Sequence, residues 1–102
     1  MKKCNQRSQA WIGDAVLALY AREWILDQPH LATTERSETF KRMTSNQFLA
    51  TLGEPTAMEA EIGAIYNTEG LAAAFKFIES KFLVRFLQQE KKRRRVGSYR
   101  DK

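Results

Sequence analysis

Two carboxylates in unusual surroundings are the residues of this sequence best suited to chemistry. Asp14 lies in the apolar run Ala10–Tyr20, directly after Gly13. Glu59 lies in a second apolar run, Thr56–Tyr66, which also contains a glycine. A glycine inside a helix costs about 1 kcal/mol relative to alanine, and a charge beside buried surface is also unfavourable. Positions that break local rules in this way usually mark close helix packing or a functional site.

Close approach of the two helices at their glycines would bring Asp14 and Glu59 to one point. Two convergent carboxylates are an ordinary way to hold a hydrated Mg²⁺ ion. Each residue also has an interpretation without chemistry. Asp14 could pair with an arginine or cap a neighbouring helix, and Glu59 could complete a capping box with Thr56 just after Pro55. The residue types alone leave these alternatives open.

The helical repeat of apolar residues predicts the elements that must position the carboxylates. No strand-like alternation and no internal repeat is present, so we expect an all-α bundle of four to five helices. The first expected helix spans about 8–27 and is ended by Pro29. The stretch 31–52 is either one helix or two helices, with a break near 44–46 and Ser45 as the cap of the second. A third helical segment is opened by Pro55 and Thr56, a turn follows at 67–70, and the last helix spans about 71–95.

The last predicted helix carries a long apolar stripe. Its members are Leu71, Phe75, Ile78, Phe82, Leu83, Phe86 and Leu87. So much apolar surface on a small body predicts that the chain completes its core by pairing with a copy of itself. Trp11 and Trp24 are expected in the core rather than as platforms for stacked bases.

The positive charge is confined to one end of the chain. The 102 residues carry a net charge of +5, yet residues 91–102 contain seven basic residues and one acid. We therefore divide the chain into a helical domain, 1–90, and a basic tail, 91–102. Such a tail is typical of an arm that binds phosphates, although a solubilising terminus has the same composition. The candidate RNA-binding residues are Lys91, Lys92, Arg93, Arg94 and Arg95.

Other chemically able residues have simpler interpretations. Cys4 is the one cysteine, so no internal disulfide is expected. Glu61 is expected to be a surface or interface charge, and His30 receives no role. Asn46 and Gln47 could contact RNA or serve the start of a helix. No signal peptide and no run of about 18 apolar residues is visible, which predicts a soluble, cytoplasmic protein.

Two stretches resemble the ribonuclease III family. Trp11–Leu17 is similar to its signature helix, a Gly-Asp-Ala-Val/Ile step inside apolar residues, and Glu59–Tyr66 followed by Gly70 is similar to its second helix. The likeness covers roughly residues 8–83. It implies an all-α dimer that cuts double-stranded RNA with Mg²⁺, or Mn²⁺, held by Asp14 and Glu59.

The family site has four carboxylates, and here the other two positions hold Ala10 and Thr56. The Mini-ribonuclease III branch, which lacks a separate RNA-binding domain, has Ala and Thr at the same places and is the nearest resemblance. A further departure is the short connection Gly53–Pro55, where the family usually has a longer, basic one.

The resemblance implies a Mg²⁺-dependent endoribonuclease acting on double-stranded or structured RNA such as ribosomal RNA precursors. The alternative is a catalytically inactive protein of the same fold that binds RNA or associates with the ribosome. The reduced carboxylate set favours this alternative, and the presence of Asp14 and Glu59 disfavours it. A helical protein-interaction module is the third hypothesis, and it predicts no salt-sensitive binding of RNA.

Overall fold

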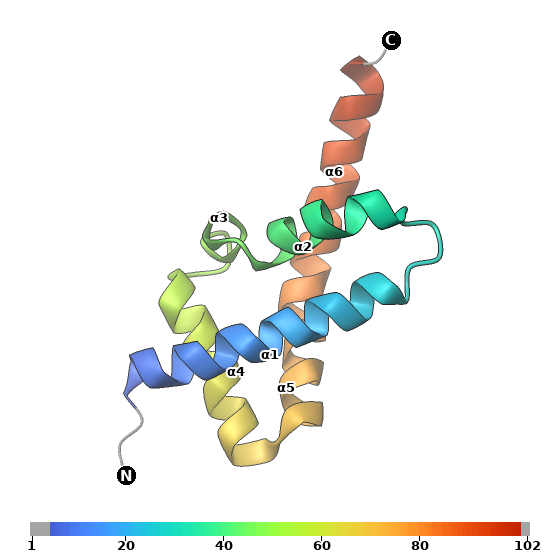
Figure 1. The fold of residues 1–102 in the computed structure, drawn as a ribbon. Helices are drawn as coiled ribbons and strands as arrows, with labels where there is room; N and C mark the ends of the chain where they lie inside the picture. The colour runs from blue at the N-terminus through green and yellow to red at the C-terminus, as the bar shows by residue number, and fades with distance from the viewer. Residues whose placement is uncertain (1–4, 101–102) are drawn as a thin grey trace.

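The structure, a computed structural model, describes residues 5–100, with side chains described through residue 93. It is all-α over this range, as the sequence predicts, with no strand (Figure 1). The elements are α1 (Gln6–Leu26), the 3₁₀ turn η1 (Thr33–Glu35), α2 (Arg36–Thr44), α3 (Asn46–Leu49), α4 (Pro55–Glu69), α5 (Leu71–Phe77), the π-helical turn η2 (Ile78–Leu83) and α6 (Val84–Arg100).

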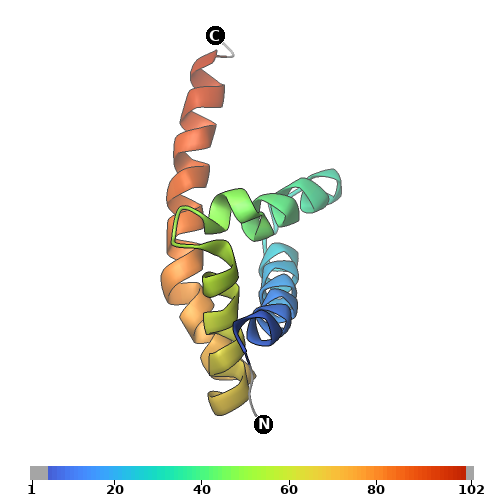
Figure 2. The ribbon, with the colours of Figure 1, turned by 90° about the vertical axis from the view of Figure 1, so that its left-hand side faces the viewer.

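The other helices pack around one long helical segment near the C-terminal end of the chain. α5, η2 and α6 follow one another without a break, and α4 runs beside α5 (Figure 2). α1 crosses α4 and α5, and α2 lies against α1 (Figure 1). The most completely buried large side chains come from α1, α3, α4 and η2: Leu17, Leu49, Ile62, Ile78 and Phe82. One core therefore ties the bundle together.

Polar caps fix where two of the helices begin. The Asn5 side chain accepts from the Ser8 N–H at 2.9 Å at the start of α1. Ser45 accepts from the Phe48 N–H at 3.0 Å and starts α3. The predicted break of the 31–52 stretch, with Ser45 as its cap, is confirmed.

The alternative role of Glu59, a capping box with Thr56, is not found. α4 begins at Pro55, and its cap is Glu54, whose Oε1 accepts from the Ala57 N–H at 2.8 Å. Proline lacks an N–H and has a helical φ, so it fits the first helical position without loss. The helix therefore begins at Pro55, and the Glu59 side chain is not needed at the cap.

The turn predicted at 67–70 is confined to its last residue. α4 continues through Glu69, and Thr68 donates to the Ala64 carbonyl at 2.9 Å. Gly70 has φ +95°, a conformation open to glycine and strained for other residues. This one residue reverses the chain between α4 and α5.

Most of the apolar stripe on the last helix is buried within this chain. Ile78, Phe82, Leu83 and Phe86 are buried, whereas Leu71 and Leu87 remain exposed. The excess surface that suggested self-association is thus largely covered by α1, α3 and α4. α6 itself passes from the predicted domain into the predicted tail as one helix.

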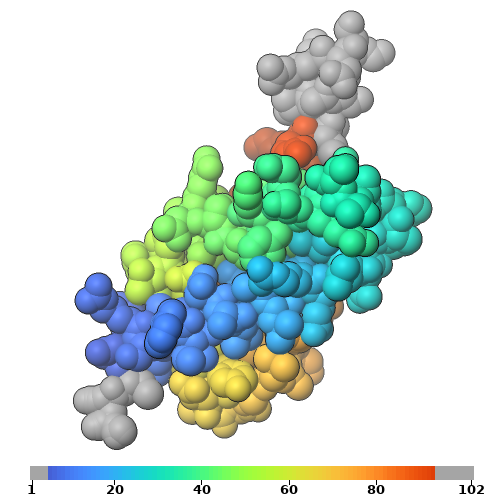
Figure 3. All heavy atoms as spheres, in the orientation of Figure 1, coloured from blue at the N-terminus to red at the C-terminus, as the bar shows by residue number. Residues whose placement is uncertain are grey.

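The expectation for the tryptophans is half right. Trp24 packs edge-on against Phe86 in the core, with ring centroids 6.2 Å apart. Trp11 is 79% exposed, contrary to prediction. Gly13 faces α4, and a residue two positions earlier lies about 200° around the helix, on the outer side. Figure 3 shows that α1 (blue) forms much of one face of the molecule.

Among residues 5–100, no helix combines the length and the apolar character needed to cross a membrane.

Candidate functional site

The two glycines singled out in the sequence lie at the crossing of α1 and α4. A Cβ atom on Gly13 would overlap the backbone carbonyl of Glu59, and one on Gly63 would overlap that of Gln9. α1 and α4 also make the most extensive contact of any two elements. The expectation that these glycines let the helices approach closely is confirmed.

This crossing brings Asp14 and Glu59 together. The Glu59 carboxyl is close enough to that of Asp14 for a hydrogen bond between them. The pKa of Glu59 is raised from an ordinary 4.5 to about 7, first by burial, then by that hydrogen bond, and then by the negative charges of Asp14 and Glu54. The surroundings of Glu59 therefore favour its protonated form.

Neither alternative for Asp14 is found in the part of the chain that the structure describes. There Asp14 forms no ion pair with an arginine and caps no helix. Its side chain is exposed beside the half-buried Glu59, so the pair opens onto the surface. An ion or a phosphate group can therefore reach both carboxyl groups.

The carboxylate set at the crossing is small. Between residues 5 and 100, no group of three or more Asp, Glu, His or Cys side chains could hold a metal ion. Ala10 and Thr56, one turn before Asp14 and Glu59, lie buried and half-buried and supply no charge. Glu61 is not part of the pair: it forms an ion pair with Lys81 at 3.8 Å, as expected for a surface charge.

The basic residues of the tail continue α6 away from the body. Lys91, Lys92 and Arg93 are exposed on this helix, whose backbone runs on through Arg100 (Figure 1). The side chains of Arg94 and Arg95 lie outside the described residues, as does all of Cys4. The exposed cations sit on an arm that projects beyond the other helices.

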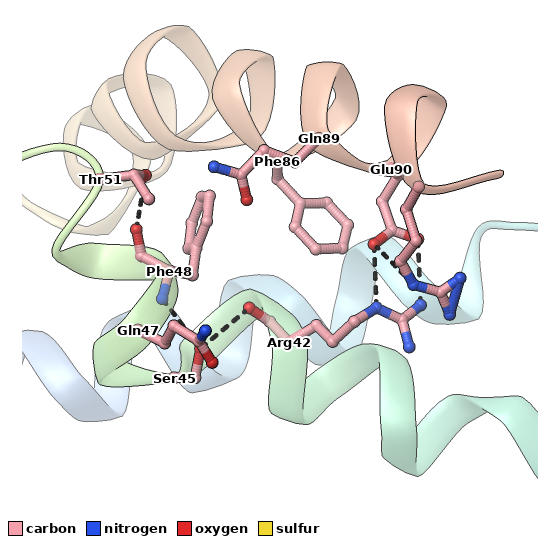
Figure 4. Close-up of a pocket in the computed structure, with 9 residues that line it drawn as sticks. Arg42, Ser45, Gln47, Phe48, Thr51, Phe86, Gln89 and Glu90 are labelled. Carbon is pink, nitrogen blue, oxygen red and sulfur yellow. Dashed lines mark hydrogen bonds and ion pairs between the residues drawn. The ribbon is translucent and has the colours of Figure 1, made fainter. Parts of the chain in front are cut away.

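A second group of polar residues meets in a groove of about 380 Å³ between α3 and α6. Arg93 and Gln47 were candidate RNA contacts from the sequence, but no sequence pattern indicated that they line one groove with Arg42 and Glu90. Arg42 donates through Nε and Nη2 to the two Glu90 carboxylate oxygens at 2.9 and 3.0 Å (Figure 4). Arg93 Nε lies 4.0 Å from the same carboxylate. Arg42 and Glu90 are 48 residues apart, so no rule of helical spacing could have paired them.

Comparison of this chain with protein-family models, with curated proteins and with solved structures found no match.

Proposed function

We propose that this chain is a Mg²⁺-dependent endoribonuclease of the ribonuclease III type, acting on double-stranded or structured RNA and closest to Mini-ribonuclease III. One observation carries the proposal. Asp14 and Glu59, the two carboxylates that the resemblance requires to meet, come together at the glycine-mediated crossing of α1 and α4. Ribosomal RNA precursors in the cytoplasm are the proposed substrate.

The carboxylate pair fits a divalent cation by its chemistry. Two carboxylates side by side repel each other, and this repulsion contributes to the raised pKa of Glu59. A cation between them would offset that repulsion and favour the charged form of Glu59. Asp14 and Glu59 would hold the ion, Mg²⁺ or Mn²⁺, while the tight crossing at Gly13 keeps their helices in place. The ion would supply Lewis-acid stabilisation of the charge that develops on the phosphate oxygens during hydrolysis.

A homodimer and an RNA-binding arm complete the proposal. The outer face of α1 exposes several large apolar side chains, which supports pairing with a second copy: Trp11, Ile12, Leu19 and Leu26. The cations of residues 91–95 would hold RNA phosphates, as the exposed positions of Lys91, Lys92 and Arg93 allow.

The test is cleavage of a labelled RNA duplex with Mg²⁺, comparing the unaltered chain with Asp14→Asn and Glu59→Gln. We expect both substitutions to reduce the rate at least about a hundredfold, since each removes half of the metal-binding charge. Glu61→Gln is the matched control, because Glu61 lies on the same helix but pairs with Lys81. Equal cleavage by all four proteins would contradict the proposed site.

A catalytically inactive RNA-binding protein is the second candidate. It is favoured by the small carboxylate set and by Ala10 and Thr56 at the other two family positions. It predicts that the unaltered chain and Asp14→Asn bind duplex RNA equally and that neither cleaves it, whereas the nuclease proposal predicts cleavage by the unaltered chain alone. The same assay therefore separates the two candidates.

A further inference from the structure

The two arginines of the groove between α3 and α6 keep N–H donors that no protein group uses. Arg42 donates through Nε and Nη2 to Glu90 and through Nη2 to Thr39 at 3.5 Å, and within residues 5–93 its Nη1 has no hydrogen-bond partner. Arg93 lies at 4.0 Å from Glu90, beyond hydrogen-bond distance, and its side chain is 54% exposed. A guanidinium group carries N–H donors in a planar fork that matches the geometry of a phosphate.

Glu90 orients Arg42 rather than cancelling the charge of the groove. The two hydrogen bonds from Arg42 to Glu90 hold the guanidinium in one position. Less side-chain freedom is therefore lost when an anion binds at Nη1 of Arg42. Glu90 is also the one acidic residue among those that line the groove. The two arginines outnumber it within the groove, and Glu35 and Glu38 line an adjoining pocket together with the same two arginines.

Neutral donors line the same groove, toward the end away from the Arg42–Glu90 pair (Figure 4). Gln47 projects from α3 and Gln89 from α6 (Figure 4), and both line the groove. Neither side-chain amide makes a hydrogen bond to any residue in the range 5–93. Glutamine amides and arginines are both common ligands of nucleic-acid phosphates.

We propose that this groove binds the phosphate backbone of duplex RNA, with Arg42 and Arg93 as the cationic ligands and Glu90 as the residue that positions Arg42. The inference rests on the RNA-binding part of the proposed function. It is supported by continuity, because Arg93 belongs both to the groove and to the exposed basic run that begins at Lys91. An RNA strand on the arm thus extends onto the body between α3 and α6.

The test is the affinity for a fluorescently labelled RNA duplex, measured by anisotropy in EDTA so that no cleavage occurs. The double variant Arg42→Gln/Glu90→Gln leaves the net charge unchanged, so its effect reports the groove and not overall electrostatics. We expect the Kd to rise about tenfold or more and the dependence on log salt concentration to become shallower by about one contact. Arg93→Gln, at an exposed position with little structural cost, is expected to act in the same direction.

Arg36→Gln is the matched control, because it removes one exposed arginine from α2 outside the groove. We expect it to change the Kd less than about threefold. Circular dichroism of every variant checks the fold, and Arg93→Gln keeps the test decisive if the double variant is unstable.

Each result has one meaning. RNA bound equally by the unaltered chain, the double variant and Arg93→Gln would overturn the groove proposal and leave the nuclease proposal standing. Absence of RNA binding by the unaltered chain would overturn both. Displacement of the RNA by polyglutamate as readily as by unlabelled duplex would assign the groove to an acidic polypeptide instead, and so would also overturn it.

Discussion

The Glu59 carboxyl combines partial burial, a hydrogen bond to Asp14 and two neighbouring negative charges. All of these features favour its protonated form, which is why its pKa rises to about 7. A residue so placed is poised to change charge near neutral pH. The change in the charge of Glu59 near neutral pH can be measured both without and with a metal ion.

The pH dependence of stability follows from this pKa. A carboxyl whose pKa is raised on folding stabilises the folded state fully below its unfolded value of 4.5, and this contribution is lost as the pH rises through about 7. We expect the free energy of unfolding to fall by about 1–2 kcal/mol over this range, since solvent screens the partly exposed group. Urea titrations at several pH values should show the slope, and Glu59→Gln should flatten it. An equal slope in Glu59→Gln would assign the pH dependence to another group.

Metal binding predicts a stabilisation that depends on Asp14. At a Mg²⁺ concentration ten times the dissociation constant, a ligand specific for the folded state adds about 1.4 kcal/mol to stability. We therefore expect Mg²⁺ to raise the Tm of the unaltered chain at pH 7, and to leave that of Asp14→Asn unchanged at matched ionic strength. The same rise in both proteins would place the ion elsewhere.

At the scale of the elements, the crossing of α1 and α4 is the decisive contact. It depends on backbone lying against backbone, because the space beside Gly13 and Gly63 is already filled by main-chain atoms. Main-chain atoms of a helix cannot move aside as the end of a side chain can. The separation of the two helices at Asp14 and Glu59 is therefore set by backbone packing.

Gly63→Ala should be strongly destabilising. Alanine favours a helix by about 1 kcal/mol over glycine, but here its Cβ would overlap the Gln9 carbonyl and force the helices apart, with an expected net loss of at least about 3 kcal/mol. The matched control is Gly53→Ala, whose Cβ would meet only the flexible Met58 side chain, at 2.9 Å. Denaturant titration measures both variants, and similar losses of free energy would contradict the crossing.

At the scale of the whole molecule, the fold leaves two surfaces uncovered in the described chain. One is the outer face of α1, where Trp11 is 79% and Leu26 63% exposed. The other is the arm formed by the end of α6, which helps to stretch the molecule to 57 × 26 × 21 Å. The apolar face suits a second copy of the chain, and the charged arm suits a polyanion.

Dimerisation through α1 predicts that Trp11→Lys and Leu19→Lys convert a dimer into a monomer. Because both positions are exposed, these changes should leave the secondary structure intact, as circular dichroism would show. Light scattering after size-exclusion chromatography gives the mass. Leu71→Lys, an equally exposed leucine on α5, serves as the control. A variant that stays dimeric would place the interface on another face.

Features that depend on neighbours along the chain could be predicted from the order of the residues. The all-α class, the cap at Ser45 and a turn that includes Gly70 follow from helical periodicity, side-chain hydrogen bonding and glycine geometry, which act over a few residues. The helix before Gly70 nevertheless runs three residues further than predicted. The meeting of Asp14 with Glu59 was also predictable, because two glycines marked the positions where their helices could touch.

The side of each helix that is buried, and the pairs of distant residues that meet, depend on tertiary packing. Trp11 was placed wrongly in the core because an apolar repeat does not say which side of a helix a neighbour will cover. The pairing of Arg42 with Glu90, 48 residues apart, has no local signature at all. Such contacts arise from the packing of whole helices, whose rotation is set by the sum of all buried surfaces and by no single segment.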